Sequence, residues 1–123
     1  MKLIVTGSAA MKDGQAVFQQ LQRLVDSGKC NLEQIIHGGC VGVDSFAGEW
    51  ARTHGIPVRI KRPQWKKLGK DAAPTRNQAM VDEGDAVLAI SLAGRSNTGT
   101  KDIVNRAKQR GIPVIQCVYR ERR

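Results

Sequence analysis

The sequence predicts an α/β domain in which helices cover both faces of a doubly wound, mostly parallel five-stranded sheet. Short apolar runs that are typical of buried strands alternate with longer amphipathic runs along the whole chain. Glycine or proline separates most of these runs. The length of 123 residues suffices for one hydrophobic core and not for two, so we expect a single domain over residues 1–123.

The first half of the chain supplies three expected strands and two expected helices. The strands span residues 2–6, 34–37 and 58–61, and the helices span residues 13–26 and 43–53. The first helix has apolar side chains at helical spacing and ends at Gly28. The second carries Trp50 on its apolar stripe, which predicts a core position for this ring, and Gly55 and Pro57 end it.

The second half supplies the remaining two strands. Residues 62–73 show no clear period and are expected to form a long loop. Pro74 suits the first position of a helix that reaches about residue 83, because the first turn has no partner for the missing N–H. A strand over 86–91, a helix over 100–109 and a strand over 114–118 complete the chain. The strand order that fits best is 3-2-1-4-5, with its switch point between the first and fourth strands.

Composition and charge exclude several classes of protein. The N-terminal apolar run of three residues is too short for a signal peptide or a membrane span, so we expect a cytoplasmic protein without membrane contact. Three cysteines without a CxxC pair indicate neither a disulfide framework nor a zinc site, and no metal or cofactor is expected. The formal net charge of +9 favours anionic partners such as nucleotides or nucleic acid.

Two glycine-containing loops follow the first two strands. In the first, Gly7 allows close approach and Ser8 offers a hydroxyl to a phosphate oxygen. The second leads directly into a helix, so its backbone N–H groups and the helix dipole favour an anion. Its candidate ligand-binding residues are His37, Gly38, Gly39, Gly42 and Asp44. Asp44 either caps the helix or faces the ribose hydroxyls or an amine of a ligand.

Two further helix starts are candidate phosphate contacts. The loop after the fourth strand supplies Gly94, Thr98, Gly99 and Thr100, for which a phosphate site is favoured over a plain turn. Arg76 and Asn77 lie in the first turn of another helix, where a basic side chain opposes the helix dipole. A bidentate contact from Arg76 to a phosphate or carboxylate would explain that position, and pairing with a surface acid is the alternative.

Two aromatic or titratable residues have both a functional and a structural interpretation. His37 ends a buried strand and is a candidate proton carrier or phosphate donor, or it connects neighbouring loops. Trp65 lies in the irregular basic segment 62–67, where it can stack on a base while the lysines meet phosphates. Packing of that segment onto the domain is the other interpretation of Trp65.

These motifs together resemble one known family. The chain resembles the YspA-like branch of the SLOG superfamily. The segments that carry the resemblance are Thr6-Gly7-Ser8, His37-Gly38-Gly39 with Gly42 and Asp44, Glu49-Trp50-Ala51, Pro74-x-Arg76-Asn77-x-x-Met80 and Thr98-Gly99-Thr100. The resemblance covers nearly the whole chain. It implies a Rossmann-like fold and a nucleotide-derived ligand. The superfamily includes the LOG phosphoribohydrolases, which activate cytokinins, and the Smf/DprA proteins, which bind single-stranded DNA.

The chain departs from the LOG pattern at the catalytic position. The LOG motif is PGGxGTxxE, and its GT corresponds to Gly99-Thr100, which places Ile103 where the resemblance would require the glutamate. Asp102 is one residue early, about 100° away on a helix. The chain also has Ser8-Ala9-Ala10 where relatives tend to show an Arg-Asp pair. An enzymatic role is therefore weakened, and Asp44 is the remaining candidate acid or base.

Three functions follow from these observations. The favoured one is a binding module, a sensor or a sequestering protein, for a nucleotide or nucleotide-derived phosphate ligand at the C-terminal ends of the parallel strands. The second is hydrolysis of an N-glycosidic or phosphoester bond of a nucleotide. The third is single-strand nucleic-acid binding, which the net charge and Trp65 favour. LOG relatives form dimers, so a homodimer is consistent with the resemblance.

Overall fold

Five parallel strands form one sheet in the order β3-β2-β1-β4-β5, which confirms the predicted topology. The structure is a computed structural model that describes residues 1–95 and 97–121. Its strands are β1 (Lys2–Gly7), β2 (Gln34–His37), β3 (Val58–Ile60), β4 (Ala86–Leu92) and β5 (Val114–Tyr119). Its longer helices are α1 (Gly14–Asp26), α2 (Val43–Thr53), α4 (Ala72–Glu83) and α5 (Thr98–Arg110).

The central strand β1 pairs with β2 on one side and with β4 on the other. Ile4 lies opposite Ile36 in β2 and opposite Val87 in β4. All four strand pairings are parallel, so the carboxyl ends of β1, β2 and β4 lie at the same edge of the sheet. The loops that follow these strands therefore meet at one edge, as the fold class predicts.

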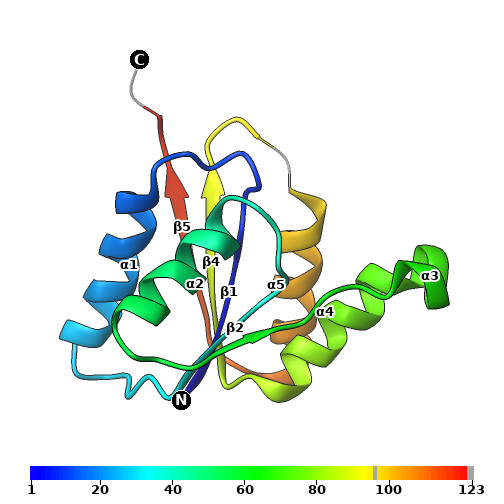
Figure 1. The fold of residues 1–123 in the computed structure, drawn as a ribbon, viewed down its shortest axis with the longest axis horizontal. Coiled ribbons are helices and arrows are strands. Elements are labelled where there is room, and N and C mark those ends of the chain that lie inside the picture. Colours follow the sequence, from blue (N-terminus) through cyan, green and yellow to red (C-terminus); the bar gives the residue numbers. More distant parts are fainter. Residues whose placement is uncertain (96, 122–123) are drawn as a thin grey trace.

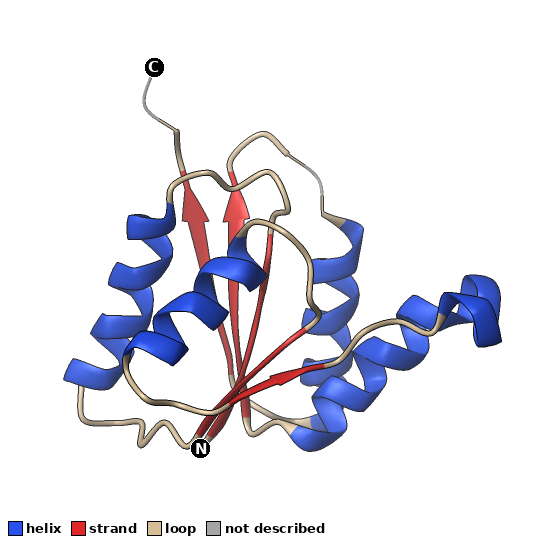
Figure 2. Cartoon of the chain, in the orientation of Figure 1, coloured by secondary structure: helices blue, strands red, loops and turns tan. Residues whose placement is uncertain are grey.

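Two apolar layers hold helices on opposite faces of the sheet (Figure 1). Successive side chains of a strand point to opposite faces. Leu3 and Val5 of β1 pack with α1 and α2, whereas Ile4 packs with α4 and α5. Trp50 of α2 is 4% exposed, which confirms its predicted core position. Helices on both faces make the domain a three-layer α/β sandwich (Figure 2).

The segment expected to be a long loop contains short helices instead. After β3, the chain forms the one-turn helix α3 (Trp65–Leu68) and the 3₁₀ turn η1 (Gly69–Asp71). Helix α4 then begins at Ala72, so Pro74 is its third residue rather than its first. A single turn is too short to show helical periodicity, which is why the sequence did not predict it. Together α3 and η1 extend from the body of the molecule (Figure 1).

The longest helices, α1 and α5, have 13 residues each. Each buries one stripe of apolar side chains against the sheet. Within the part of the chain that the structure describes, no helix combines the length and apolar character needed to cross a bilayer.

Candidate functional site

The turn after β2 is held by the carboxylate of Asp44. The backbone N–H groups of Gly38 and Cys40 donate to Asp44 Oδ2 at 3.0 and 3.4 Å. Asp44 lies in the first turn of α2, whose N-cap residue is Gly42, and it makes no capping bond to that helix. Its carboxylate folds back onto the preceding turn, an arrangement that neither sequence interpretation of Asp44 included.

Arg76 reaches this turn from α4, where it is the fifth residue and therefore follows the first turn in which the sequence analysis expected it. Its Nη1 donates to the carbonyl oxygens of Gly38 at 2.9 Å and Lys61 at 3.2 Å, and its Nε donates to Asn77 Oδ1 at 2.8 Å. A guanidinium has five N–H donors, so the two on Nη2 are left for another acceptor. No carboxylate within residues 1–95 and 97–121 forms an ion pair with Arg76. The alternative of pairing with a surface acid is therefore not met in this structure.

A second guanidinium, that of Arg62, lies against the same turn. A Cβ atom added to Gly39 would stand 2.8 Å from Arg62 Nη1, and one added to Gly38 would stand 2.5 Å from Arg76 Nη1. Like Arg76, Arg62 forms no ion pair within the described residues. The sequence placed Arg62 in a basic segment and gave no sign that it meets the glycine turn.

Both arginines line one cavity of about 170 Å³. Arg62 and Arg76 line it together with Lys61, Gln64 and Thr75, and no carboxylate is among its lining residues. Lys61 is paired with Glu83 at 2.9 Å, so Arg62 and Arg76 are the lining cations without an ion pair among the described residues, and the charge of Arg76 also acts on the nearby Asp44 carboxylate. Cationic and hydroxyl or amide groups around one small cavity favour an anion.

Burial shifts the pKa values of two residues at this turn in opposite directions. Burial raises the pKa of Asp44 to about 6, although the Gly38 and Cys40 amides and the charge of Arg76 act to lower it. Burial, with the charges of Arg52 and Arg62, lowers the pKa of His37 to about 4. At neutral pH Asp44 is therefore mostly ionised and His37 is neutral.

The ring of His37 lies under α2. Its Nδ1 accepts a hydrogen bond from Gly39 N at 3.0 Å, so the proton of the neutral ring is on Nε2. A Cβ atom added to Gly48 of α2 would stand 2.9 Å from that Nε2, which has no hydrogen-bond partner among the described residues. His37 is 3% exposed. This geometry favours a structural role for His37 in its loop, close to the interpretation that it connects neighbouring loops, over that of a proton carrier.

Gly7, Ser8 and Gly42 join the first loop to the second. Ser8 O accepts from the N–H of Val43 at 3.2 Å, and Ser8 Oγ accepts from Ala10 N at 3.1 Å. Gly42 has a φ of +81°, and a Cβ atom there would collide with the Ser8 carbonyl oxygen. Ser8 is 6% exposed, so its hydroxyl serves the loop in this structure.

Asn77 connects Arg76 to helix α5. The buried Asn77 amide accepts from Arg76 Nε and donates through Nδ2 to Asp102 Oδ2 at 2.9 Å. Arg106 Nε also donates to that oxygen, at 2.8 Å. Burial alone would raise the pKa of Asp102, but the bonds from Arg106 and Asn77 lower it below its ordinary value. Ile103, at the position of the LOG glutamate, is 4% exposed and belongs to the core.

The start of α5 divides its predicted ligand-binding residues into buried and exposed groups. Thr100 is 5% exposed, and its hydroxyl lies 3.1 Å from that of Thr6. Asn97, which the sequence analysis did not select, is the N-cap and accepts from Thr100 N at 3.0 Å. Thr98 and Gly99 are exposed. Gly94 has a φ of +79° in the preceding turn, and a Cβ atom there would meet open space.

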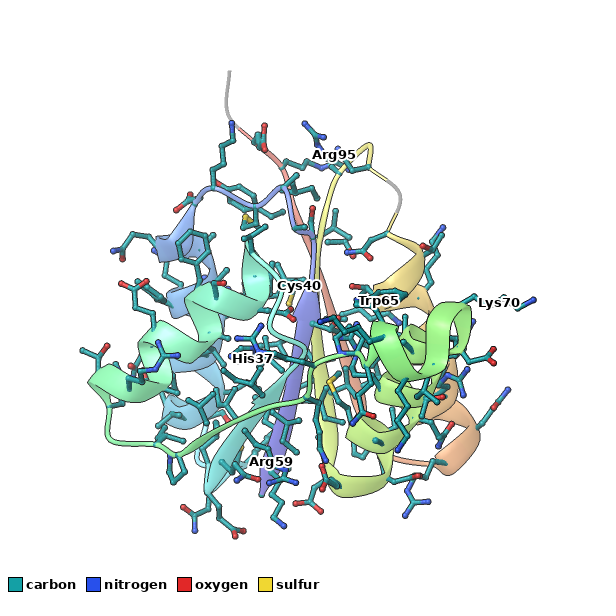
Figure 3. The ribbon with its side chains drawn as sticks, turned by 45° about the vertical axis from the view of Figure 1, so that its right-hand side comes forward. His37, Cys40, Arg59, Trp65, Lys70 and Arg95 are labelled. Atoms are coloured by element: carbon teal, nitrogen blue, oxygen red, sulfur yellow. The ribbon has the colours of Figure 1, made fainter. Side chains whose placement is uncertain are left out.

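Trp65 is not covered by the rest of the domain. Trp65 is 58% exposed at the start of α3, and it lies on the same side of the molecule as Lys70 (Figure 3). Packing of this segment onto the domain therefore does not bury the ring, and the prediction that the ring stacks on a base stays a prediction.

A five-stranded parallel sheet in this order, with glycine turns at its carboxyl edge, defines a Rossmann-like α/β protein. The chain belongs to the YspA, cpYpsA-related SLOG family (YAcAr), whose model matches residues 1–68. It is 37% identical over 120 residues to the gene 61 protein of Mycobacterium phage D29, covering 93% of this chain and 94% of that protein. The crystal structure of TM1055 is 17% identical, with a TM-score of 0.66 over 92% of this chain and 71% of that one, a likeness of fold.

Proposed function

We propose that the protein binds a nucleotide or nucleotide-derived ligand through a phosphate held between Arg62 and Arg76. The observation that carries the proposal is the placement of two guanidinium groups, neither of which forms an ion pair within the described residues, against consecutive glycines and beside one cavity. Two like charges repel each other, and a phosphate placed between them would remove that repulsion. Membership of the SLOG family supports a nucleotide-related ligand.

The backbone around Arg76 fixes the direction in which it binds. Three of its N–H groups are occupied by Gly38 O, Lys61 O and Asn77 Oδ1, so the planar guanidinium is held before a ligand arrives. A preorganised guanidinium loses little conformational entropy when it meets a phosphate. The exposed Thr98 and Gly99 at the start of α5 are candidates for a further contact to the same ligand.

Native mass spectrometry with a panel of nucleotides, cyclic nucleotides, dinucleotides and ADP-ribose derivatives tests the proposal. A bound mass identifies the ligand class, and calorimetry then compares variants. Arg76→Ala should weaken binding by about 1.5–3 kcal/mol, or roughly 10- to 150-fold, the scale of a charged hydrogen bond. Arg110→Ala is the matched control. It removes an exposed arginine at the C-terminal end of α5 that pairs with Asp82 of α4.

Two outcomes of this experiment would contradict the proposal. If no member of the panel binds, the proposed function is wrong. If a ligand binds but Arg76→Ala and Arg110→Ala have the same effect, the phosphate does not lie at the glycine turn.

A second candidate function is single-strand nucleic-acid binding by the α3 segment. The exposed ring of Trp65 and the exposed Lys66, Lys67 and Lys70 favour it, since aromatic stacking and phosphate contacts are the usual elements of such binding. Affinity for an oligonucleotide should then fall steeply with salt, and Trp65→Ala should weaken it. Oligonucleotides that do not bind even at low salt would exclude this function.

Nucleotide hydrolysis has less support. The position of the LOG glutamate is the buried Ile103, and the Asp44 carboxylate is occupied by two backbone N–H groups. Release of a free base or phosphate from a nucleotide during incubation would nevertheless establish it, and Asp44→Asn should then abolish the release.

A further inference from the structure

A second cavity, of about 300 Å³, lies between α5 and strands β4 and β5. We call it the α5–β5 groove. Helix α5 contributes Lys101, Asn105 and Lys108 to it, and β5 contributes Gln116. None of its lining residues lines the Arg62–Arg76 cavity. Its lining also includes Asn97 and Thr100, which adjoin the Thr98 and Gly99 named above as candidate contacts of the nucleotide.

The basic residues of α5 differ according to the side they face. Arg106 pairs with Asp102 of the same helix and donates to Gln78 Oε1 of α4, and Arg110 pairs with Asp82 of α4. Lys101 and Lys108 line the groove on the other side of the helix and form no ion pair within the described part of the chain. No carboxylate is among the lining residues of the groove.

A third cation, Arg95, enters the groove from the loop after β4 and is also without an ion-pair partner among the described residues. Figure 3 shows this arginine at the end of the molecule where β4 and β5 finish. Three uncompensated cations on one groove create a local positive potential that attracts multiply charged anions.

The spacing of the cations indicates an extended anion. Lys101 and Lys108 are seven residues apart, which is about 10 Å along a helix. Between them Asn105 of α5 and Gln116 of β5 offer amide groups as hydrogen-bond donors, and Ala89 and Val104 provide apolar surface. No aromatic side chain lines the groove, so it has no stacking surface for a base.

We propose that the α5–β5 groove binds a short chain of linked phosphates, with Arg95, Lys101 and Lys108 as its cationic contacts. The ligand class is an inorganic or terminal oligophosphate of two or more phosphoryl groups. The assignment goes beyond nucleotide binding at the glycine turn and holds whether or not that function is correct.

Titration of the ¹⁵N-labelled protein with sodium tripolyphosphate, followed by NMR, tests this assignment. Amide signals of Ser91, Asn105, Lys108 and Gln116 should shift, and the shifts at Gly38 and Gly39 should not follow the same titration curve. The double variant Lys101→Gln/Lys108→Gln should weaken the binding by about tenfold or more, because two charged contacts are lost. Lys12→Gln/Lys29→Gln is the matched control, since it removes the same charge from exposed lysines that line neither the groove nor the Arg62–Arg76 cavity.

Several outcomes would overturn the assignment. Equal weakening in both double variants would mean that only net charge matters. Orthophosphate that binds the groove as tightly as tripolyphosphate would exclude an extended ligand, and a thymidine oligonucleotide that binds it more tightly would point to nucleic acid instead. Loss of the groove shifts in Arg76→Ala would mean that the groove is not a separate site. If Arg76→Ala abolishes nucleotide binding and leaves these shifts intact, the two sites are independent.

Discussion

The Nη1 atom of Arg76 donates a hydrogen bond to the carbonyl oxygen of Gly38 at 2.9 Å, between residues 38 positions apart in the sequence. A Cβ atom at Gly38 would stand 2.5 Å from that nitrogen and 3.2 Å from Asp44 Oδ2. The absence of a side chain at position 38 therefore lets a cation and a carboxylate approach the same turn from α4 and from α2.

Gly38→Ala should displace the guanidinium of Arg76 because the new methyl group occupies its place. We expect nucleotide affinity to fall by about as much as in Arg76→Ala, and the free energy of unfolding to fall by about 1–3 kcal/mol. Calorimetry and urea denaturation measure the two effects. Gly99→Ala, whose Cβ atom would meet Asn97 Oδ1 at an ordinary 3.6 Å, should not reduce stability. Unchanged affinity in Gly38→Ala would contradict a role of this turn in binding.

Asp44 and His37 should have opposing effects on stability in mildly acidic solution. The pKa of Asp44 is raised from 3.8 to about 6, so between these values the native state holds more protons than the unfolded state and stability falls as pH rises. The pKa of His37 is lowered from 6.5 to about 4, so in that window the unfolded state holds more protons and stability rises with pH.

Single variants separate these two effects. Compared with the unchanged protein, Asp44→Asn should make the free energy of unfolding rise more steeply between about pH 4.5 and 6, by about 1–2 kcal/mol across that window. His37→Asn should make it fall with pH in the same window. Urea denaturation at several pH values measures both slopes, and parallel curves for all three proteins would refute the assignment.

Thr6 and Thr100 form a buried hydroxyl pair that we expect to support stability rather than ligand binding. Thr100→Val should reduce the free energy of unfolding by about 1–2 kcal/mol, because Thr6 loses its partner in a buried place. The double variant Thr6→Val/Thr100→Val should be nearly as stable as the unchanged protein, since no hydroxyl is left unpaired. A thermodynamic cycle by urea denaturation measures the coupling. If replacement of Thr100 weakened ligand binding and replacement of the exposed Thr98 did not, the assignment of Thr100 to stability would be wrong.

Asn77 should matter for stability and for the position of Arg76. Asn77→Ala removes the acceptor of Arg76 Nε and one of the two donors to Asp102 Oδ2, so we expect a loss of about 1–3 kcal/mol in the free energy of unfolding. Ligand binding should weaken less than in Arg76→Ala, because the guanidinium itself remains. Asp102→Asn is the companion variant. A ligand affinity lower than that of Arg76→Ala would show that Asn77 contacts the ligand directly.

The sequence alone determined the topology of the sheet. The apolar runs at β1, β2 and β4 are short and almost wholly buried, and amphipathic helices with clear stop residues separate them. Local propensity, periodicity and turn residues all agree in these segments, so strand order followed from the rules for parallel sheets. The glycine turns at the carboxyl edge, and the selection of Arg76 as a residue with an unexplained charge, came from the same patterns.

Only the tertiary structure decided which side chains meet at the site. Arg62 came from a segment without periodicity, and its contact with Gly39 depends on the path of the chain between β3 and α3, which has no regular pattern to predict it. The sequence placed Asp44 and Thr100 at helix starts but did not show that Asp44 turns back to bind the loop or that Thr100 pairs with Thr6. Periodicity reports which face of an element is buried, whereas hydrogen bonds between residues 94 positions apart depend on how the elements pack.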